Sequence, residues 1–418
     1  MTTLKAVTGT RDILPEEVGG WHRIEAAARS LFARYGYREI RTPLFEATEL
    51  FARGIGADTD IVAKEMYSFE DRDGASLTLR PEATAGIVRA VIEHNLMNTD
   101  PALKVYALGP MFRRERPQKG RYRQFHQVDV EAFGETEPSV DAEIVEMAVR
   151  YIESCGLTQH QLVINSVGDS RCRPAYVDRL RQALRANRGR LGPDSQRRTE
   201  TNPLRVLDSK AAEEQQLIEA LPRIADSLCP ECREHFQEVK RELDLLGIRY
   251  RESHRLVRGL DYYVRTTFEI TSSALGAQDA VLGGGRYDGL VKTLGGPDVG
   301  GIGFALGMER LVMLLPQSAP AGRCQVFLAP LVASDEARER VALLQKQLRN
   351  QGHSVLRARE ARSLKSQLKR ADKLGARFVA ILGEDELLGK AWTVRDMASS
   401  SQERVADEEV MAYLGERL

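Results

Sequence analysis

The chain of 418 residues has neither a net charge nor a long apolar run. Lys and Arg together number 60, and so do Asp and Glu, so no global basic charge indicates nucleic-acid binding and any contact with a polyanion must use local patches. No apolar run approaches the length that spans a membrane. Residues 1–9 have neither a hydrophobic signal core nor an amphipathic presequence. We therefore expect a cytoplasmic protein that does not enter a membrane.

Cysteine is scarce, with five residues in the chain, and without a secretory signal this favours a reducing compartment over a disulfide framework. Cys229 and Cys232 have the spacing of a metal-binding or redox pair. A structural zinc site needs four ligands, however, and His235 is the only other close candidate. A thioredoxin-like role lacks its βαβ context. We therefore expect no zinc and no protein-held metal.

Two common nucleotide-binding motifs are missing. The glycine-rich segments 282–290 and 300–311 match neither the P-loop nor the dinucleotide fingerprint, which argues against those nucleotide folds. Such glycines can mark tight turns only, or they can let a ligand approach the backbone closely. The remaining composition, 42% hydrophobic and 29% charged, is ordinary for a chain with a sizeable core and two or three domains.

The most informative stretch is residues 108–134, which reads as strand, loop and strand. One acid, Glu115, stands in the loop among basic residues at Arg113, Arg114, Arg116, Lys119, Arg121 and Arg123. A hairpin with this charge is expected to hold a polyanion. The return strand, Gln124–Phe133, alternates so that one face is apolar. Its other face carries Phe125, Gln127, Asp129, Glu131 and Phe133, which makes a binding site more plausible than a solvated surface.

A second polar position lies in the segment Arg80-Pro-Glu-Ala-Thr84. The strand-like run before Pro81 and the helical run after it place Glu82 and Thr84 at a strand-to-helix corner. Glu82 then has two interpretations. It is either an acid that complements the dipole in the first turn of the helix, or a ligand-binding group presented at the corner.

The chain is expected to fall into four parts, with boundaries at 1–170, 171–250, 251–318 and 325–418. Residues 171–250 are charge-dense, nearly free of aromatics and helical in period, which predicts an inserted helical module. Its arginine cluster fits either a solvated face or an RNA-facing patch. Residues 316–322 read as a linker, and the stretch beyond them alternates between strands and helices.

Taken together, these segments resemble class II aminoacyl-tRNA synthetases, and in detail the histidyl-tRNA synthetases, from residue 9 to the C-terminus. Residues 37–43 resemble motif 1 of the class, residues 112–115 with their loop resemble motif 2, and residues 303–310 resemble motif 3. More specific to histidine are Arg80–Thr84, Arg258-Gly-Leu-Asp-Tyr-Tyr263 and Gly284-Gly-Arg-Tyr-Asp-Gly289. Ala83 departs from the usual glycine of the family, and Arg114 stands where histidine is often found.

The resemblance implies an α+β fold with a six-stranded antiparallel sheet flanked by helices, an inserted helical domain and a C-terminal α/β anticodon-binding domain. It also implies a two-step reaction. The histidine carboxylate attacks the α-phosphorus of ATP, pyrophosphate leaves, and the 3′-terminal adenosine of histidine tRNA then takes the histidyl group. Mg²⁺ is expected with ATP, and motif 1 implies a homodimer.

The resemblance also implies a role for each residue that matches a motif. Arg113 and Arg258, the catalytic pair, would hold the carboxylate and the α-phosphate from opposite sides, because two anions that must meet need guanidinium groups between them. Arg121 and Arg310 would contact the outer phosphates of ATP. Arg310 and Phe125 would stack on the two faces of adenine, and Glu115 would accept from the exocyclic amine of adenine. The α-ammonium of histidine would be bound by Glu82, Thr84 and Gln127, and its imidazole by Glu131 and Tyr263, with Tyr262 adjacent and Ala83 beside the pocket.

Two alternatives belong to other functional classes. One is a non-catalytic synthetase paralogue that serves as the regulatory subunit of a histidine-biosynthetic phosphoribosyltransferase. Such paralogues lack the anticodon domain and lose the substrate contacts, whereas this chain retains residues 325–418 together with Arg113, Arg258 and Arg310. The other is an RNA-binding or sensor module without chemistry, which the intact Arg258 and Tyr263 disfavour.

Overall fold

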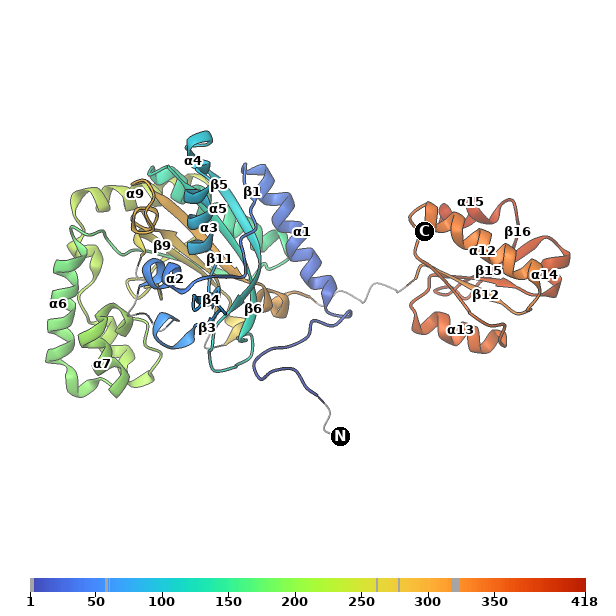
Figure 1. Ribbon diagram of the computed structural model, residues 1–418, viewed down its shortest axis with the longest axis horizontal. Coiled ribbons are helices and arrows are strands. Elements are labelled where there is room, and N and C mark those ends of the chain that lie inside the picture. The colour runs from blue at the N-terminus through green and yellow to red at the C-terminus, as the bar shows by residue number, and fades with distance from the viewer. Residues whose placement is uncertain (1–3, 57–58, 60, 261, 277–278, 317–323) are drawn as a thin grey trace. The chain divides into compact units, whose positions relative to one another are not determined.

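The chain divides into two compact units, Met1–Gln317 and Ser318–Leu418 (Figure 1). The computed structural model describes residues 4–316 and 324–418, except for 57–58, 60, 261 and 277–278. The linker expected at 316–322 lies outside the described residues from 317 onward. Within the described part of the chain, the helices are too short or too polar to cross a membrane.

The first unit is built on one large sheet with the strand order β1-β5-β6-β11-β10-β9-β7-β8. Its strands are β1 (Arg38–Glu39), β5 (Lys104–Phe112), β6 (Gln124–Phe133), β7 (Gln161–Ser166), β8 (Arg251–Glu252), β9 (Val264–Thr271), β10 (Ala280–Arg286) and β11 (Gly301–Gly307). The strands from β5 to β7 in this order pair antiparallel, and the two-residue strands β1 and β8 pair parallel at the edges. The predicted antiparallel sheet is confirmed, with a short parallel strand added at each edge.

The main core lies on the apolar face of β6. Val128, Val130 and Ala132 alternate along that strand and pack in one cluster with helices α1 (Val18–Arg34) and α5 (Pro138–Ser154). Helix α1 buries Trp21, Ile24, Ala28 and Phe32, which recur every three or four residues on one side of a helix. The helix begins at Val18, directly after a turn at residues 15–17.

A small three-stranded sheet and the helix that follows it form the corner that carries Glu82 and Thr84. Strands β2 (Phe45–Ala47), β3 (Tyr67–Glu70) and β4 (Ser76–Leu79) form a sheet in the order β2-β4-β3. Strand β4 leads into α3 (Thr84–Glu93), so the expected strand-to-helix corner is present. The remaining helices here are α2 (Thr48–Ile55), a π-helical turn (Ile61–Glu65), α4 (Leu96–Thr99), α10 (Leu290–Thr293) and α11 (Met308–Leu314).

Residues 171–250 are helical, as their periodicity predicts. They contain α6 (Arg173–Ala186), α7 (Pro193–Thr201), α8 (Gln215–Glu219), α9 (Pro230–Leu245) and several 3₁₀ turns, and Figure 1 shows α6 and α7 on the opposite side of the first unit from α1. Tyr176, Leu180 and Leu184 on α6 pack with Leu217 and Ile218 in a cluster separate from the main core. The exact boundaries of an inserted domain remain predictions.

The second unit has a five-stranded sheet in the order β13-β12-β14-β15-β16. Its elements are β12 (Val326–Pro330), α12 (Asp335–Asn350), β13 (Val355–Arg357), α13 (Leu364–Lys373), β14 (Phe378–Leu382), α14 (Glu384–Leu388), β15 (Ala391–Asp396), β16 (Gln402–Ala406) and α15 (Val410–Gly415). The predicted alternation of strands and helices is confirmed, but α14 and β16 were not expected. Both are short and mostly polar, so neither has the apolar period of a core element.

A buried ion pair ties together three elements of the first unit. Asp141 on α5 accepts hydrogen bonds from Arg286 on β10, at 2.9 Å to Nε, and its other oxygen lies 2.8 Å from Nε2 of His235 on α9. Arg286 and Asp141 have fully buried side chains. Although burial raises the pKa of Asp141, the charge and hydrogen bonds of Arg286 and His235 hold this pKa below its ordinary value.

Replacing Asp141 with alanine is expected to destabilise the first unit by ~3–5 kcal/mol, because the buried Arg286 loses its buried partner and keeps only the ion pair with the partly exposed Asp288. Urea denaturation measures this loss. The matched control is Glu49→Ala, which removes an exposed pair with Arg53 and is expected to cost less than ~1 kcal/mol. Equal stabilities for the two variants would show that the buried pair does not hold these elements together.

Candidate active site

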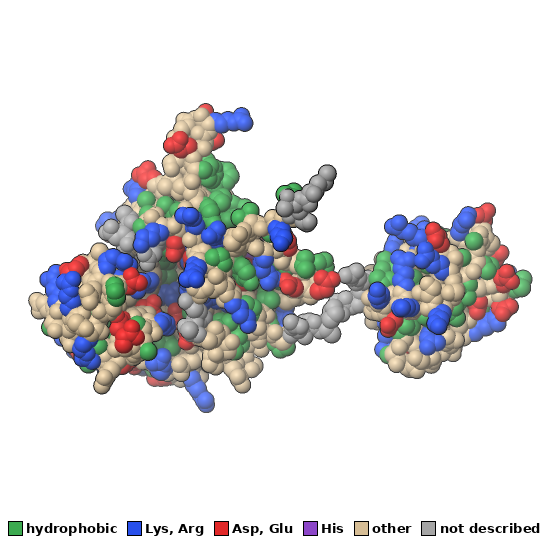
Figure 2. Space-filling view, turned by 90° about the horizontal axis from the view of Figure 1, so that it is seen from below, with side chains coloured by type: hydrophobic (Ala, Val, Ile, Leu, Met, Phe, Trp, Pro, Cys, Tyr) green, Lys and Arg blue, Asp and Glu red, His purple; other side chains and the backbone are tan. Residues whose placement is uncertain are grey.

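A cavity of about 800 Å³ opens beside β6, β10 and the loop between β5 and β6. Figure 2 shows basic and acidic side chains gathered around a hollow in the larger unit. The cavity brings together seven of the residues selected from the sequence, namely Arg113, Glu115, Arg121, Phe125, Gln127, Arg258 and Arg310. Arg197, Arg198 and Arg205 of the helical module also line it, so part of that arginine cluster faces the cavity.

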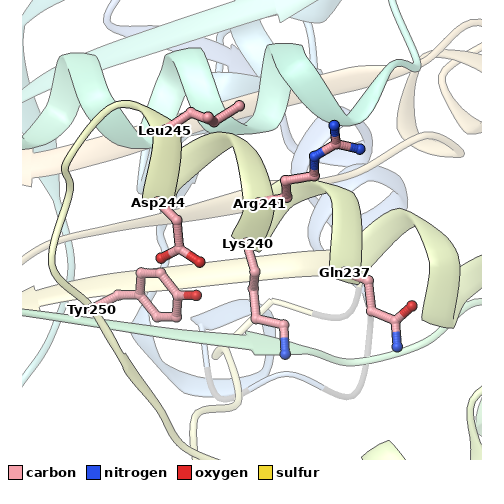
Figure 3. A pocket seen from close by; sticks show the side chains of 6 residues that line it. All are labelled: Gln237, Lys240, Arg241, Asp244, Leu245 and Tyr250. Carbon is pink, nitrogen blue, oxygen red and sulfur yellow. The ribbon is translucent and has the colours of Figure 1, made fainter.

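A second hollow, of about 480 Å³, lies on the outer side of α9 and has a different character (Figure 3). It is lined by Gln237, Lys240, Arg241, Asp244, Leu245 and Tyr250. Lys240 donates to Glu252 at 2.9 Å and lies over the ring of Phe236, so it is already paired. Most of the lining side chains are exposed and none is fully buried, so we assign no site here.

The hairpin loop holds its arginines in fixed positions. Arg113 donates through Nε to the carbonyl of Pro81 at 2.8 Å, and its guanidinium lies 5.3 Å from the centre of the Phe125 ring. Glu115 accepts from Arg121 at 2.9 Å and lies 3.9 Å from Arg113. The two arginines therefore share one carboxylate and retain donors for a further anion.

Arg258 lies over strand β10 because that strand has no side chain to block it. A Cβ atom added at Gly283 would stand 2.2 Å from Nη1 of Arg258. The guanidinium donates to Glu269 at 3.0 Å and lies 5.7 Å from the centre of the Tyr263 ring. Its Nε atom is buried and has no partner among the described residues. Arg258 thus retains a donor in a desolvated position.

Arg310 occupies the first turn of α11 and lines the same cavity as Arg121. It donates to the carbonyl of Ala280, which fixes its position at the end of β10. Burial and the nearby positive charge of Arg121 lower the pKa of Arg310. Since two like charges repel in a partly desolvated wall, a bound anion would stabilise both.

Beyond Gln127, outside the residues that line the cavity, lies a group of buried carboxyl groups that we call the floor. Glu82, Asp129 and Glu131 are 4%, 1% and 2% exposed. Burial is the largest cause that raises the pKa of all three groups, to about 8 for both Asp129 and Glu131. Oδ2 of Asp129 and Oε1 of Gln127 are buried without a partner among the described residues. The floor therefore has an excess of acceptors, which suits a cationic ligand with several N–H donors.

The corner residues connect to this floor. Glu82 accepts the backbone N–H groups of Thr84 at 2.7 Å and of Ala85 at 3.0 Å. These are the bonds expected of an acid that caps the first turn of a helix. The hydroxyl of Thr84 donates to Glu131 at 2.6 Å. Ala83 is fully buried in the neighbouring apolar cluster, which also includes part of Tyr262. Glu82 is only 4% exposed, which is more burial than a first-turn acid requires. Both interpretations of Glu82 are therefore compatible with the structure.

Sequence reasoning missed two polar residues of the floor. Asp129 was noted on the correct strand face but not selected, although its alternation with Gln127 and Glu131 marks it. The hydroxyl of Tyr287 donates to Glu131. The sequence feature that could have identified Tyr287 is its position within the motif at residues 284–289. Both side chains are 1% exposed.

The sequence argument against a metal at Cys229 and Cys232 was wrong about the available ligands. His235 is bound to Asp141 instead. Asp169 and Cys172 stand beside the pair, and the ligand atoms of these four residues lie within 4.8 Å of one another.

The raised pKa of Asp129 predicts how stability depends on pH. A folded pKa of about 8 against an ordinary value of 3.8 means that the folded protein keeps a proton that the unfolded chain releases. Stability contributed by this group is present below about pH 4 and is lost as the pH rises through about 8, at up to ~1.4 kcal/mol per pH unit. The variant Asp129→Asn should therefore lose less stability between pH 5 and pH 8 in urea titrations. The exposed control Asp178→Asn should follow the wild type, and parallel curves for all three proteins would contradict the shift.

Comparisons with known proteins identify the family of this chain. A family model described as histidyl-tRNA synthetase matches residues 9–311, and one described as an anticodon-binding domain matches residues 325–417. The chain is 50% identical over 412 residues to a histidine–tRNA ligase of Solibacter usitatus, which covers 98% of this chain and 99% of that protein. It also resembles the crystal structure of apo histidyl-tRNA synthetase from S. aureus, with 38% identity, a TM-score of 0.81 and coverage of 99% and 100%.

A more distant structure has the same fold but too little sequence identity to indicate function. An ATP phosphoribosyltransferase regulatory subunit/histidyl-tRNA synthetase from Bacillus halodurans aligns with a TM-score of 0.67 at 20% identity, covering 92% of this chain and 99% of that one. That similarity concerns the fold only. The family model over residues 9–311 and the relative that is 50% identical over nearly the whole chain go further: the chain belongs to the histidyl-tRNA synthetase family.

Proposed function

We propose that this chain acts as a histidine–tRNA ligase. It activates L-histidine with ATP to form histidyl-adenylate and pyrophosphate, and it then transfers histidine to the 3′ end of its cognate tRNA. The observation that carries the proposal is one cavity with arginines along its walls and unpartnered buried acceptors at its floor. This arrangement suits a ligand that is cationic at one end and joined to phosphates at the other.

The floor is proposed to recognise histidine. Glu82, Thr84 and Gln127 bind the α-ammonium group, because a carboxylate and two neutral acceptors match three N–H donors. Glu131 and Tyr263 bind the two imidazole nitrogens. The bond between Thr84 and Glu131 places both groups in one network, so the ammonium and imidazole sites adjoin. Tyr262 and the methyl group of Ala83 close the pocket.

Asp129 is proposed to neutralise the bound ammonium from below. Its unpartnered oxygen and raised pKa describe a carboxyl group without a counter-ion, which a cationic amino group would supply. A polar floor of this kind rejects analogues that leave its groups unpaired, by ~10⁴-fold or more.

The walls are proposed to carry the chemistry of activation. Arg113 and Arg258 bind the α-phosphate and the histidine carboxylate, so the attacking oxygen meets phosphorus without repulsion between two anions. Arg121 and Arg310 bind the outer phosphates and stabilise the charge on the departing pyrophosphate. Adenine stacks on Phe125 and Arg310, and Glu115 accepts from its amine. No side-chain base is needed, since the carboxylate is already ionised.

Mg²⁺ is proposed to enter with ATP. It usually binds substrate phosphates and waters with only one or two carboxylates, and Glu269 lines the cavity together with Arg310. Among the described residues, the only cluster of three or more metal-ligating groups is elsewhere, at Asp169 and the cysteines. The residues present therefore fit a phosphate-held ion better than a protein-held one. Bound in this way, Mg²⁺ would neutralise charge on the phosphates.

The tRNA is proposed to meet several basic segments. Arg114, Arg116 and Lys119 at the hairpin tip are candidates for the acceptor end, and the second unit is proposed to bind the anticodon. A homodimer in the cytoplasm is also proposed. Leu44, Phe45 and Phe69, close to the motif 1 segment, are apolar and 42%, 53% and 47% exposed, as expected for a surface that a second copy covers.

The regulatory-subunit alternative is less well supported. Residues 325–417 match an anticodon-binding domain, although the Bacillus halodurans structure whose name includes that regulatory role also aligns over 92% of this chain. Arg113, Arg258 and Arg310 all line the cavity, so the phosphate-binding groups have not been lost.

The purified protein is expected to catalyse histidine-dependent exchange between ATP and pyrophosphate with Mg²⁺ and without tRNA. Replacing Arg258 with alanine should lower kcat/KM for this exchange by ~10²–10³-fold, because a preorganised donor to the developing charge is lost. Radiolabelled pyrophosphate measures the exchange, and circular dichroism checks the fold.

The matched control is Arg241→Ala, an arginine on the outer hollow of α9 that is 72% exposed and should keep full exchange. No exchange in the wild type would refute the ligase and favour the regulatory subunit. Near-normal exchange by the Arg258 variant would mean that its role is misassigned.

A further inference from the structure

Four potential metal ligands converge in the first unit, away from the residues proposed to bind substrates. They are one carboxylate and three thiols, from Asp169, Cys172, Cys229 and Cys232, and their ligand atoms all lie within 4.8 Å of one another. Cys172 and Cys232 are 6% and 0% exposed. Each pair has two intervening residues, which is the spacing of the ligand pairs in structural zinc sites.

Three separate elements bring the ligands together. Asp169 follows the end of β7, Cys172 is the residue before α6, and Cys229 is the residue before α9, with Cys232 in its first turn. The N-termini of two helices therefore lie at the thiols. The backbone N–H of Asp169 also donates to Sγ of Cys172 at 3.4 Å.

A neighbouring arginine orients the carboxylate. Arg171 donates to Oδ2 of Asp169 at 3.0 Å and is held in turn by Glu231 at 3.0 Å. The other oxygen, Oδ1, lies 3.5 Å from Sγ of Cys172 and 4.0 Å from Sγ of Cys229. Oδ2 is thus engaged by the arginine side chain, whereas Oδ1 accepts the backbone N–H of Arg171 at 3.0 Å and also lies toward the sulfurs. Ligands of metal sites are likewise positioned by outer hydrogen bonds.

We propose that Asp169, Cys172, Cys229 and Cys232 form a structural zinc site. Zn²⁺ is bound tetrahedrally by thiolate and carboxylate ligands, with Zn–S distances of about 2.3 Å, so a small inward movement of the four side chains closes the shell. Four protein ligands leave no open position, so the site is structural rather than catalytic. This proposal does not depend on the proposed ligase function.

A disulfide accounts for the cluster less well. Joining any two of the three thiols leaves the third thiol and the carboxylate outside the new bond. A metal ion uses all four groups at once. Three soft thiolates with one hard carboxylate suit Zn²⁺, which is borderline in softness, better than Mg²⁺ or Ca²⁺, which take oxygen ligands.

The site would fix a connection to the floor of the cavity. Arg173, next to Cys172, donates to the backbone carbonyls of Val167 at 2.9 Å and of Gly168 at 3.0 Å, and also to that of Tyr263. Tyr263 itself packs against the apolar cluster that contains Cys172 and Cys232. Zinc would therefore hold β7, α6 and α9 in register with the segment that presents Tyr263.

Metal analysis of the untagged full-length protein tests the proposal. Mass spectrometry of elements should find about one zinc ion per chain after purification without chelators. The double variant Cys229→Ser/Cys232→Ser should contain at least about tenfold less. The matched controls Cys155→Ala and Cys324→Ala change buried cysteines outside the cluster and should keep their zinc.

A second readout uses the wild type alone, so it does not depend on a variant that folds. Exchange of the metal for Co²⁺ should give thiolate-to-cobalt charge-transfer absorption and the d–d bands of a tetrahedral site. Zinc below about a tenth of an equivalent together with no cobalt spectrum would overturn the proposal. A Cys229–Cys232 disulfide found in the metal-free wild type by mass spectrometry would overturn it in favour of a redox pair.

Discussion

The first unit holds three carboxyl groups close together and away from water, and the rest of its structure has to compensate for them. Asp129 and Glu131 extend from one strand toward Glu82, and all three carboxyl groups lie almost out of reach of water. Such a cluster is unfavourable in an empty protein, and the raised pKa values reflect this. It persists because the sheet is pinned elsewhere, by the buried pair of Asp141 and Arg286 and by the apolar core on the opposite face of β6. One face of β6 therefore packs in the core, and the opposite face carries the buried carboxyl groups.

Patterns within one segment were predictable from the sequence. Alternation along β6 predicted which side chains face the main core and which lie on the opposite face of the strand, because a strand alternates with period two. The loop arginines and the corner at Glu82 followed from charge and from local helix signals. The edge strands β1 and β8 and the polar elements α14 and β16 did not, because two to five residues with little apolar content carry no periodic signal.

Contacts between distant segments were not predictable in this way. Tyr287 reaches Glu131 across 156 positions of sequence, and Asp169 meets Cys229 across 60. Proximity along the chain pointed to His235 as the companion of the two cysteines, but the fold turns that side chain toward Asp141. For such residues only the tertiary structure decides which partner is near, and composition carries no information about it.

The run of glycines in β10 has a consequence for how the gene can vary. An added Cβ at Gly283, Gly284 or Gly285 would stand within 2.2–2.6 Å of an existing atom, either a guanidinium nitrogen or a backbone oxygen. Every amino-acid replacement reachable from a glycine codon adds at least that atom. These three codons therefore tolerate synonymous change only, unless the neighbouring strand or Arg258 moves at the same time. The strand that leaves room for Arg258 is for that reason a part of the protein with very little mutational freedom.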